Sequence, residues 1–187
     1  MKQTTIANLK RLKRKYLHYF LAGFVDGEGS FNVSFARHPT ARARFLITLR
    51  FQVYQHKDNE EILYLFYDVF RCGQVITKWG TDVRVFTVEG RQNLKEKVIP
   101  FFKKYPLATK AEAFEKFEKV LMMMEGGIHK QPQGFREIVE LAYAMNIHGK
   151  ARKIPKEELI KTVENNLMQT RRILRDQTPN TTAFNGE

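Results

Sequence analysis

The stretch LAGFVDGEGSF, residues 21–31, decides how this chain folds. It continues an apolar run that precedes it, and together they predict a buried helix over residues 16–25 that is ended by Gly27 and Gly29. Gly23 and Gly27 are four residues apart, so a second backbone could approach this helix closely. The stretch therefore predicts both a core helix and a close contact along it.

Two acids follow at the C-terminal end of this predicted helix. Asp26 and Glu28 lie against the negative end of the helix dipole, where an unpaired carboxylate is unfavourable. A divalent cation would remove the conflict, because Mg²⁺ accepts one or two carboxylates together with carbonyl oxygens and water. Glu28 and the main-chain oxygen of Gly27 are the natural pair of ligands. The alternative is a polar turn between helix and strand, which is what two acids beside glycines usually mean.

Two hairpins and a series of helices are predicted next. The pattern favours an α+β fold of the type αββαββα with additional C-terminal helices, in which helices cover one face of an antiparallel sheet and leave the other face open. The strands are predicted at residues 30–37, 44–53, 74–78 and 83–88, and the helices at residues 58–71, 93–103, 109–125, 135–146 and 155–174.

The composition limits the class of protein. The 187 residues carry 32 Lys and Arg against 20 Asp and Glu, a net charge of +12 that attracts polyanions. Nucleic acid is therefore the leading partner, and a basic ribosomal protein is the alternative. The single Cys72 excludes an intramolecular disulfide and a zinc site built on paired cysteines. There is neither a secretory signal nor an apolar run that could span a bilayer, so no membrane partner is expected.

The domain organisation is predicted to be simple. One domain is expected over residues 16–175, because a chain of this length can bury one substantial core. Residues 1–15 are interpreted as a basic N-terminal arm, with a mitochondrial transit peptide as the alternative, and residues 176–187 as a disordered tail.

The first predicted hairpin contains no acid. Between Gly29 and Lys57 there is no Asp or Glu, and cationic and short polar side chains share the predicted open face. This mixture suits phosphates and base edges, and a two-stranded ribbon fits the major groove of B-DNA. An ordinary solvated sheet face, the alternative, would normally carry both signs of charge. The predicted DNA contacts from both hairpins are Asn32, Ser34, Arg37, His38, Arg42, Arg44, Thr48, Arg50, Gln52, Gln74, Lys78 and Arg84.

Residues 21–31, followed by a polar-faced hairpin, resemble the motif of the LAGLIDADG homing endonucleases of the single-motif, homodimeric type. The resemblance extends over residues 16–146 and includes FQVYQ at residues 51–55 and PLATK at residues 106–110. It implies the fold of that family, in which the antiparallel sheet forms a DNA-binding saddle.

The resemblance also implies a role for each matching residue. Glu28 would bind the essential metal and Gly27 would contribute its main-chain oxygen, whereas Asp26 would be structural. Gln55 would help to position the attacking water, and Lys110 would stabilise charge near the scissile phosphate. Glu28, Gln55 and Lys110 are thus the predicted catalytic residues. Mg²⁺ is the expected ion, and Mn²⁺ or Ca²⁺ could occupy the same sites.

Two positions depart from the family pattern. Several relatives have Asp where this chain has Glu28, which keeps the charge and lengthens the side chain. An arginine near the active site of some relatives is replaced by Asn59, for which Lys57 could compensate. The metal geometry can therefore differ from that of the relatives.

The function implied by the resemblance is a site-specific homing endonuclease that makes a Mg²⁺-dependent double-strand break with 3′ overhangs and promotes intron mobility. An intron origin implies an organellar location, in a chloroplast or a mitochondrion. Two alternatives stay open: an intron maturase that binds its own intron RNA, and a DNA-binding protein that does not cleave. One motif per chain implies a homodimer on a long near-palindromic double-stranded DNA site. The predicted dimer interface consists of Leu21, Ala22, Gly23, Val25 and Asp26.

Overall fold

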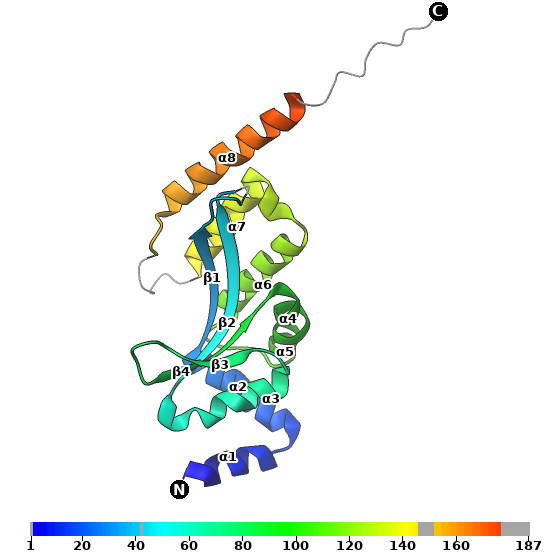
Figure 1. The fold of residues 1–187 in the computed structure, drawn as a ribbon. Helices are drawn as coiled ribbons and strands as arrows, with labels where there is room; N and C mark the ends of the chain where they lie inside the picture. Colours follow the sequence, from blue (N-terminus) through cyan, green and yellow to red (C-terminus); the bar gives the residue numbers. More distant parts are fainter. Residues whose placement is uncertain (1, 42, 146–151, 177–187) are drawn as a thin grey trace, which may run out of the picture.

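The protein is built on a curved antiparallel sheet whose two hairpins match the predicted ones (Figure 1). The computed structural model describes residues 2–41, 43–145 and 152–176. The predicted DNA contact Arg42 and residues 177–187 of the predicted tail lie outside these ranges. Within the described ranges, no helix is both long and apolar enough to cross a membrane.

The strand order joins the two hairpins through their second strands. The strands are β1 (Gly29–Arg37), β2 (Phe45–His56), β3 (Gln74–Thr77) and β4 (Val83–Glu89). Their order is β1-β2-β4-β3, and every neighbouring pair is antiparallel. In β1 and β2 the inward side chains are mostly buried and the outward ones are partly exposed, as the alternation predicts.

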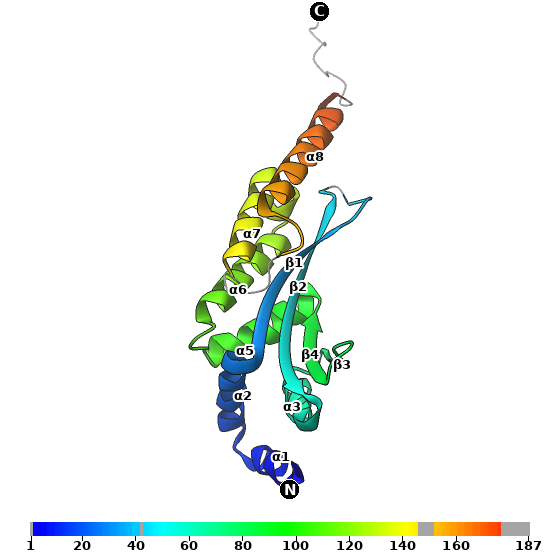
Figure 2. The same cartoon turned by 90° about the vertical axis from the view of Figure 1, so that its left-hand side faces the viewer.

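Helices cover one face of the sheet, as predicted. One group lies near the end of the sheet where β1 begins, and α6 and α7 lie along the rest of the first hairpin (Figures 1 and 2). The helices and helical turns are α1 (Lys2–Arg11), α2 (Arg14–Glu28), η1 (Lys57–Asn59), α3 (Glu61–Phe70), α4 (Arg91–Asn93), η2 (Leu94–Val98), α5 (Ile99–Lys104), α6 (Ala111–Glu125), η3 (Ile128–Lys130), α7 (Pro132–Ala144) and α8 (Lys156–Asp176).

The helix that carries the motif is longer than predicted. α2 continues through Gly27 and ends only at Gly29, whose backbone N–H bonds to the carbonyl of Val25. A glycine within a helix costs about 1 kcal/mol relative to alanine, which the burial of neighbouring apolar side chains outweighs. At Gly29 a side chain would not fit, because a Cβ atom there would lie 2.4 Å from Val25 Cγ1. The prediction that Gly27 ends the helix was therefore wrong, and Gly29 fixes the step into β1.

The basic N-terminal segment also differs from the prediction. Residues 2–11 form α1, and the arm expected over residues 1–15 thus contains a helix and the first residues of α2. This segment has no proline or glycine to interrupt a helix, and Lys10 and Arg11 lie in the last turn, where cations favour the helix dipole.

Aromatic side chains join the helical layer to the sheet. Phe31 of β1 packs 5.3 Å from Phe51 of β2 and 5.5 Å from Phe102 of α5, measured between ring centroids. Each fully buried ring of this size contributes about 2 kcal/mol through burial. A smaller cluster joins the outer end of the first hairpin to α7 and α8, and consists of Phe45, Phe135, Val139, Leu159, Val163 and Leu167. The core thus holds the end of α2 in a fixed position beside the sheet.

Candidate functional site

Asp26 is held by the loop that precedes α6. Its carboxylate accepts hydrogen bonds from the backbone N–H groups of Ala108 (2.8 Å), Thr109 (3.0 Å) and Lys110 (3.0 Å), and from the Thr109 hydroxyl at 3.1 Å. Partial burial on its own would raise the pKa of Asp26, but these hydrogen bonds hold it below its ordinary value. Asp26 therefore fastens the end of α2 to the start of α6 with an ionised carboxylate.

Lys110 lies over the main-chain oxygens at the end of the same helix. Its ammonium donates to the carbonyl of Asp26 and lies 3.3 Å from the carbonyl of Gly27. Because α2 ends at Glu28, these carbonyls have no partner one turn further along the helix. Lys110 thus places a positive charge beside the Gly27 oxygen that was predicted as a ligand.

Glu28 contrasts with its neighbours. It is the last residue of α2 and its side chain is exposed. No residue of the described ranges forms a hydrogen bond or an ion pair with its carboxylate. The end of α2 therefore carries an unpaired carboxylate one residue after the Gly27 carbonyl, and the ammonium of Lys110, from the loop before α6, lies beside that carbonyl.

Gln55 lies at the same end of the sheet. The pairing of Gly29 with Val53 places Gln55 beyond the start of β1, on the inward side of β2. Its side-chain oxygen accepts a hydrogen bond from the backbone N–H of His56 at 2.7 Å. The structure thus brings Gly27, Glu28 and Lys110 together, and places Gln55 on the adjoining strand without a bond to them.

Among the described residues there is no group of three or more His, Cys, Asp or Glu side chains that could hold an ion. The donors present are the Glu28 carboxylate and the Gly27 carbonyl, both hard oxygen ligands. This donor set fits Mg²⁺, which is bound by one or two carboxylates and keeps several waters.

The open face of the sheet carries most of the predicted DNA contacts. Asn32 lies opposite Arg50, and Ser34 lies opposite Thr48, so these four side chains share one face. The register continues from Gln52 through Thr87 to Gln74, which extends this face into the second hairpin. Lys78 follows β3, and its ammonium lies 5.9 Å from the ring centre of Tyr54 on the same face. The open face is defined here as Asn32, Ser34, Thr48, Arg50, Gln52, Tyr54, Gln74 and Lys78.

Arg84 and Arg37 do not lie on the open face. Arg84 lies opposite Gln55 on the helix-covered side, where its Nε bonds to Glu60 at 2.8 Å. Arg37 has the inward register of β1 and forms an ion pair with Glu158 of α8. Arg84, predicted as a DNA contact, therefore has an inward strand position on the covered side, and Arg37 is exposed at the hairpin end rather than on the open face.

The hairpin turn holds two further predicted contacts. Arg44 precedes β2 with a backbone φ of 61°, in the left-handed region, and its guanidinium donates to the carbonyl of Pro39. The prediction that Arg44 continues the strand alternation was wrong, because the turn ends only at this residue. His38 lies in the same turn, with Nδ1 3.2 Å from the Thr40 hydroxyl. Both side chains belong to the turn beyond the sheet.

The predicted dimer interface is wrong for three of its residues. Leu21, Ala22 and Val25 are at most 2% exposed, because they pack into the core of their own chain. The outward side of α2 is different: a Cβ atom at Gly23 or Gly27 would have no neighbour within 4 Å. We define the outward stripe of α2 as Tyr16, Phe20, Gly23 and Gly27, which recur at helical spacing and are exposed.

Tyr54 and Trp79 were not among the residues selected from the sequence. Tyr54 lies on the open face, and its hydroxyl donates to the Gln52 side-chain oxygen at 2.9 Å. Trp79, between β3 and β4, is 96% exposed, although tryptophan is usually largely buried. A tryptophan within a turn sequence, beside Lys78 and Gly80, was the signal that could have identified it.

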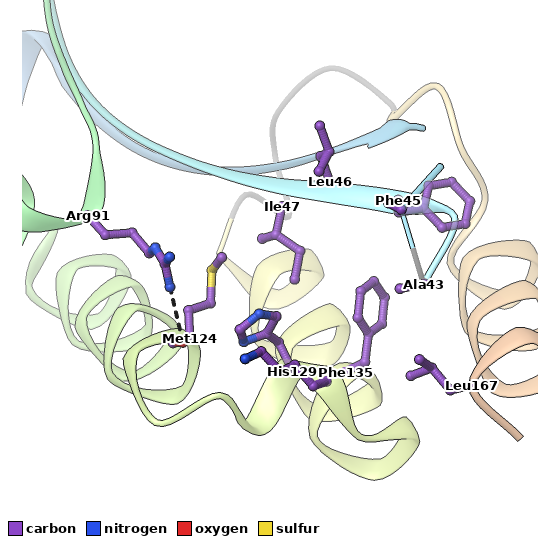
Figure 3. Close-up of a pocket in the computed structure, with 11 residues that line it drawn as sticks. Ala43, Phe45, Leu46, Ile47, Arg91, Met124, His129, Phe135 and Leu167 are labelled. Atoms are coloured by element: carbon purple, nitrogen blue, oxygen red, sulfur yellow. Dashed lines mark hydrogen bonds between the residues drawn. The ribbon is translucent and has the colours of Figure 1, made fainter. Parts of the chain in front are cut away.

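A separate pocket of about 350 Å³ lies under the outer end of β2. Figure 3 shows Ile47 of β2 and Phe135 of α7 on its opposite walls, with Arg91 donating to the carbonyl of Met124 at 3.2 Å. Its lining is mostly apolar and includes none of the residues at the end of α2. This pocket therefore belongs to the packing of the hairpin on α6 and α7, and not to the site around Glu28.

Fold and site together define an αββαββα protein with an acidic site at the end of its first core helix. The family model described as LAGLIDADG endonuclease matches residues 21–121, which is more than half of the chain. The chain belongs to the LAGLIDADG endonuclease family.

Individual relatives agree with this assignment. DNA endonuclease I-CeuI of Chlamydomonas moewusii is 34% identical over 116 residues, which cover 59% of this chain and 53% of that protein. Homing endonuclease I-ApeII of Aeropyrum pernix is 25% identical, with 79% of this chain and 90% of that protein covered. The crystal structure of the homing endonuclease I-TnaI matches with a TM-score of 0.69 and 35% identity, and covers 83% of this chain and 98% of that one. This chain thus spans about half the length of I-CeuI and almost all of I-TnaI.

Proposed function

We propose that this protein is a site-specific homing endonuclease that hydrolyses both strands of double-stranded DNA in the presence of Mg²⁺. The observation that carries the proposal is the free carboxylate of Glu28 beside the Gly27 carbonyl and the Lys110 ammonium. The proposal is supported by the family to which the chain belongs and by I-CeuI, a relative that is itself named a DNA endonuclease.

The open face would bind the DNA. Lys78 can neutralise a phosphate, and Arg50 can do so by exchanging its ion pair with Glu89, which lies opposite it on β4, for a contact with DNA. The side chains of Asn32 and Gln52 can both donate to and accept from base edges. Trp79 at the turn offers an exposed ring that could stack or pack against the sugar-phosphate backbone. Base contacts from the sheet would select the site, and charge would supply most of the affinity.

The residues at the end of α2 would carry out the hydrolysis. Bound Mg²⁺ would lower the pKa of a coordinated water and stabilise the leaving 3′ oxygen. Glu28 and the Gly27 carbonyl would hold the ion, and Lys110 would stabilise the charge that develops on the scissile phosphate. Gln55, on the adjoining strand, would orient the attacking water through its amide group. Asp26 would hold the loop that carries Lys110 against the end of α2, close to Glu28 in the sequence.

Two copies of the chain are needed to cut two strands. We propose a homodimer that packs through the outward stripe of α2, where Gly23 and Gly27 would let two helices approach closely. The two Glu28 side chains would then lie near the two-fold axis, and the DNA site would be nearly palindromic. Cleavage across the minor groove would leave 3′ overhangs.

The biological role would be the mobility of an intron. Relatives from Neurospora crassa are named probable intron-encoded endonucleases, which supports an intron origin for this chain. We propose an organellar location on the same basis.

The test is cleavage of a randomised near-palindromic DNA library by the purified protein. Wild type in Mg²⁺ is expected to give double-strand products that are absent in EDTA and absent with Glu28→Gln. The matched control is Glu115→Gln, which removes one exposed negative charge from α6 and should cleave like wild type. If wild type binds DNA or RNA selectively but leaves every phosphodiester intact in Mg²⁺, the nuclease proposal is overturned and a maturase or regulator takes its place.

A further inference from the structure

The helical side of the molecule carries a second pocket that the cleavage site does not explain. Its volume is about 480 Å³, and it lies between the beginning of α2, the end of α3 and the η2–α5 segment. None of its lining residues belongs to the sheet. His18, in its wall, precedes Glu28 by ten residues of α2, which is roughly 15 Å along the helix. The pocket is therefore separate from both the open face and the end of α2.

This pocket is lined by four cations and one acid. The cations are Arg14, Lys15, Lys97 and Lys104, and the acid is Glu96. The Glu96 carboxylate accepts a hydrogen bond from the side chain of Gln92 at 3.2 Å. Within the described ranges, none of the four cations forms an ion pair. The pocket thus holds a local excess of positive charge.

Neighbouring lysines on the same elements behave differently. Lys95 of η2 lies 3.2 Å from a carboxylate oxygen of Glu125, and Lys103 of α5 pairs with Glu118. Lysines one or two positions apart in the sequence therefore differ. Lys95 and Lys103 form ion pairs on the surface, whereas Lys97 and Lys104 line the pocket and form none in the described ranges. Mere abundance of basic residues does not account for this difference.

One ring nitrogen of His18, in the wall of the pocket, lacks a hydrogen-bond partner among the described residues. Its side chain is 7% exposed and lies edge-on to Phe101 and Tyr105, with ring centroids 5.4 and 4.9 Å away. Nδ1 has no hydrogen-bond partner in the described part of the chain, although buried polar atoms almost always have one. Burial lowers the pKa of His18, and the charges of Arg14 and Lys104 lower it further. An anion in the pocket would offset the repulsion from these two cations.

We propose that this pocket binds a phosphate group, either free or carried by a nucleic acid backbone. Phosphate carries more than one negative charge when free and presents several strong acceptor oxygens, which suit a cluster of Lys and Arg donors. The volume exceeds what one phosphate needs, and the rings of Phe101 and Tyr105 provide an apolar wall for an attached sugar or base.

The pocket would remain accessible in the proposed dimer. At about 100° per residue, Tyr16 and Phe20 of the outward stripe each lie about 160° around α2 from His18. The stripe and the pocket thus occupy nearly opposite sides of the same helix. Binding in the pocket can therefore be measured whether or not the protein dimerises or cleaves DNA.

The test is a titration of the protein with a phosphate-bearing probe, followed through the NMR signals of the His18 ring. These signals are assigned by their absence from the spectrum of His18→Gln. Inorganic phosphate is one probe, and a short 5′-phosphorylated single-stranded oligonucleotide is the other, both without Mg²⁺. With wild type, at least one probe should produce a saturable change and raise the pKa of His18. Lys97→Gln combined with Lys104→Gln should weaken this binding by about fivefold or more. The paired lysines give the control, because Lys95→Gln combined with Lys103→Gln removes the same charge and should change binding by less than about twofold.

Each outcome is decisive for the pocket. Saturation by phosphate alone identifies a small free ligand, and tighter binding of the oligonucleotide that depends on Lys97 and Lys104 identifies a nucleic acid backbone. If neither probe produces a saturable change, or if both double variants weaken binding equally, the pocket is not a phosphate site. None of these results depends on cleavage, so a failure here leaves the proposed nuclease function untouched.

Discussion

The two acids at the end of α2 lie two residues apart but have different partners. The carboxylate of Asp26, next to the buried Val25, is bound by three backbone N–H groups of the loop before α6. Glu28 has no hydrogen-bond or ion-pair partner in the described ranges, and Gly23 of the outward stripe has open space around it. The contrast teaches that Asp26 holds the chain together, and that Glu28 and the outward stripe are available for a metal, DNA and a second chain.

The largest expected effect comes from Glu28, the acid without a partner in the described residues. Glu28→Gln should slow DNA cleavage by at least about a hundredfold, because the free carboxylate that would bind the ion is lost. The melting temperature should stay within the error of wild type, since the Glu28 side chain is exposed and forms no hydrogen bond or ion pair with the described residues. Cleavage rates in Mg²⁺ and thermal melts check the two halves of this prediction. A large drop in stability would place Glu28 among the residues that hold the chain together.

A bulky residue on the outward stripe should prevent dimer formation. Gly23→Phe is expected to leave the monomer folded, because a Cβ there would meet no atom within 4 Å in the described residues outside the adjacent turns of its own helix. Sedimentation should show a dimer for wild type and a monomer for the variant. Glu115→Phe adds the same ring to an exposed position of α6 and should leave the dimer intact. A dimeric Gly23→Phe variant would contradict the assignment of the stripe.

The bound acid, Asp26, should matter for stability. Asp26→Ala removes the acceptor of three backbone N–H groups and should lower the free energy of unfolding by about 3 kcal/mol. Urea denaturation measures the change. A loss below about 0.5 kcal/mol would show that the loop before α6 does not depend on this carboxylate.

The pH dependence of stability gives a second readout for Asp26. Its pKa is lowered in the folded protein, so its contribution is complete above the unfolded pKa of about 3.9 and is lost as the pH falls through the folded value. Wild type should therefore lose more stability than Asp26→Asn as the pH falls below about 4. Parallel curves for the two proteins would contradict the hydrogen-bonding account.

Two arginines extend the comparison to the sheet. Arg50→Gln, on the open face, should weaken DNA binding by about tenfold and reduce the salt dependence by about one ion. Arg84→Gln, on the covered face, should leave DNA affinity unchanged and lower stability by about 0.5 kcal/mol through loss of its pair with Glu60. Salt-dependent binding isotherms would separate the two arginines, and denaturation curves would show a similar small loss for both, because Arg50 also pairs with a carboxylate, that of Glu89. If Arg50→Gln and Arg84→Gln weakened DNA binding equally, the assignment of DNA binding to the open face and not to the covered face would be wrong.

The sequence predicted the architecture because the first hairpin alternates cleanly. Side chains in β1 and β2 change face at every residue, so the apolar pattern alone places Asn32 and Arg50 on the open side. The pairing of Gly29 with Val53 was not required for that inference. Fold type, strand order within each hairpin and the covered face were therefore accessible before the structure.

Other features depended on contacts that no local pattern encodes. In β4, Val85, Phe86, Thr87 and Val88 are all buried, so the alternation could not indicate the face of Arg84. α2 is apolar around most of its circumference, and its sequence alone could not separate the inward Leu21 from the outward Phe20. The bonds from residues 108–110 to Asp26 join segments more than 80 residues apart. Only the family resemblance indicated that this acid is structural.

The most direct test of the central claim is single-turnover cleavage of a bound DNA site by Glu28→Gln and Asp26→Asn, at a temperature where both variants are folded. The account predicts that Asp26→Asn still cuts in Mg²⁺ and that Glu28→Gln binds the same DNA without cutting it. The opposite result, cleavage by Glu28→Gln and none by folded Asp26→Asn, would contradict the division between the two acids and reassign the metal-binding carboxylate.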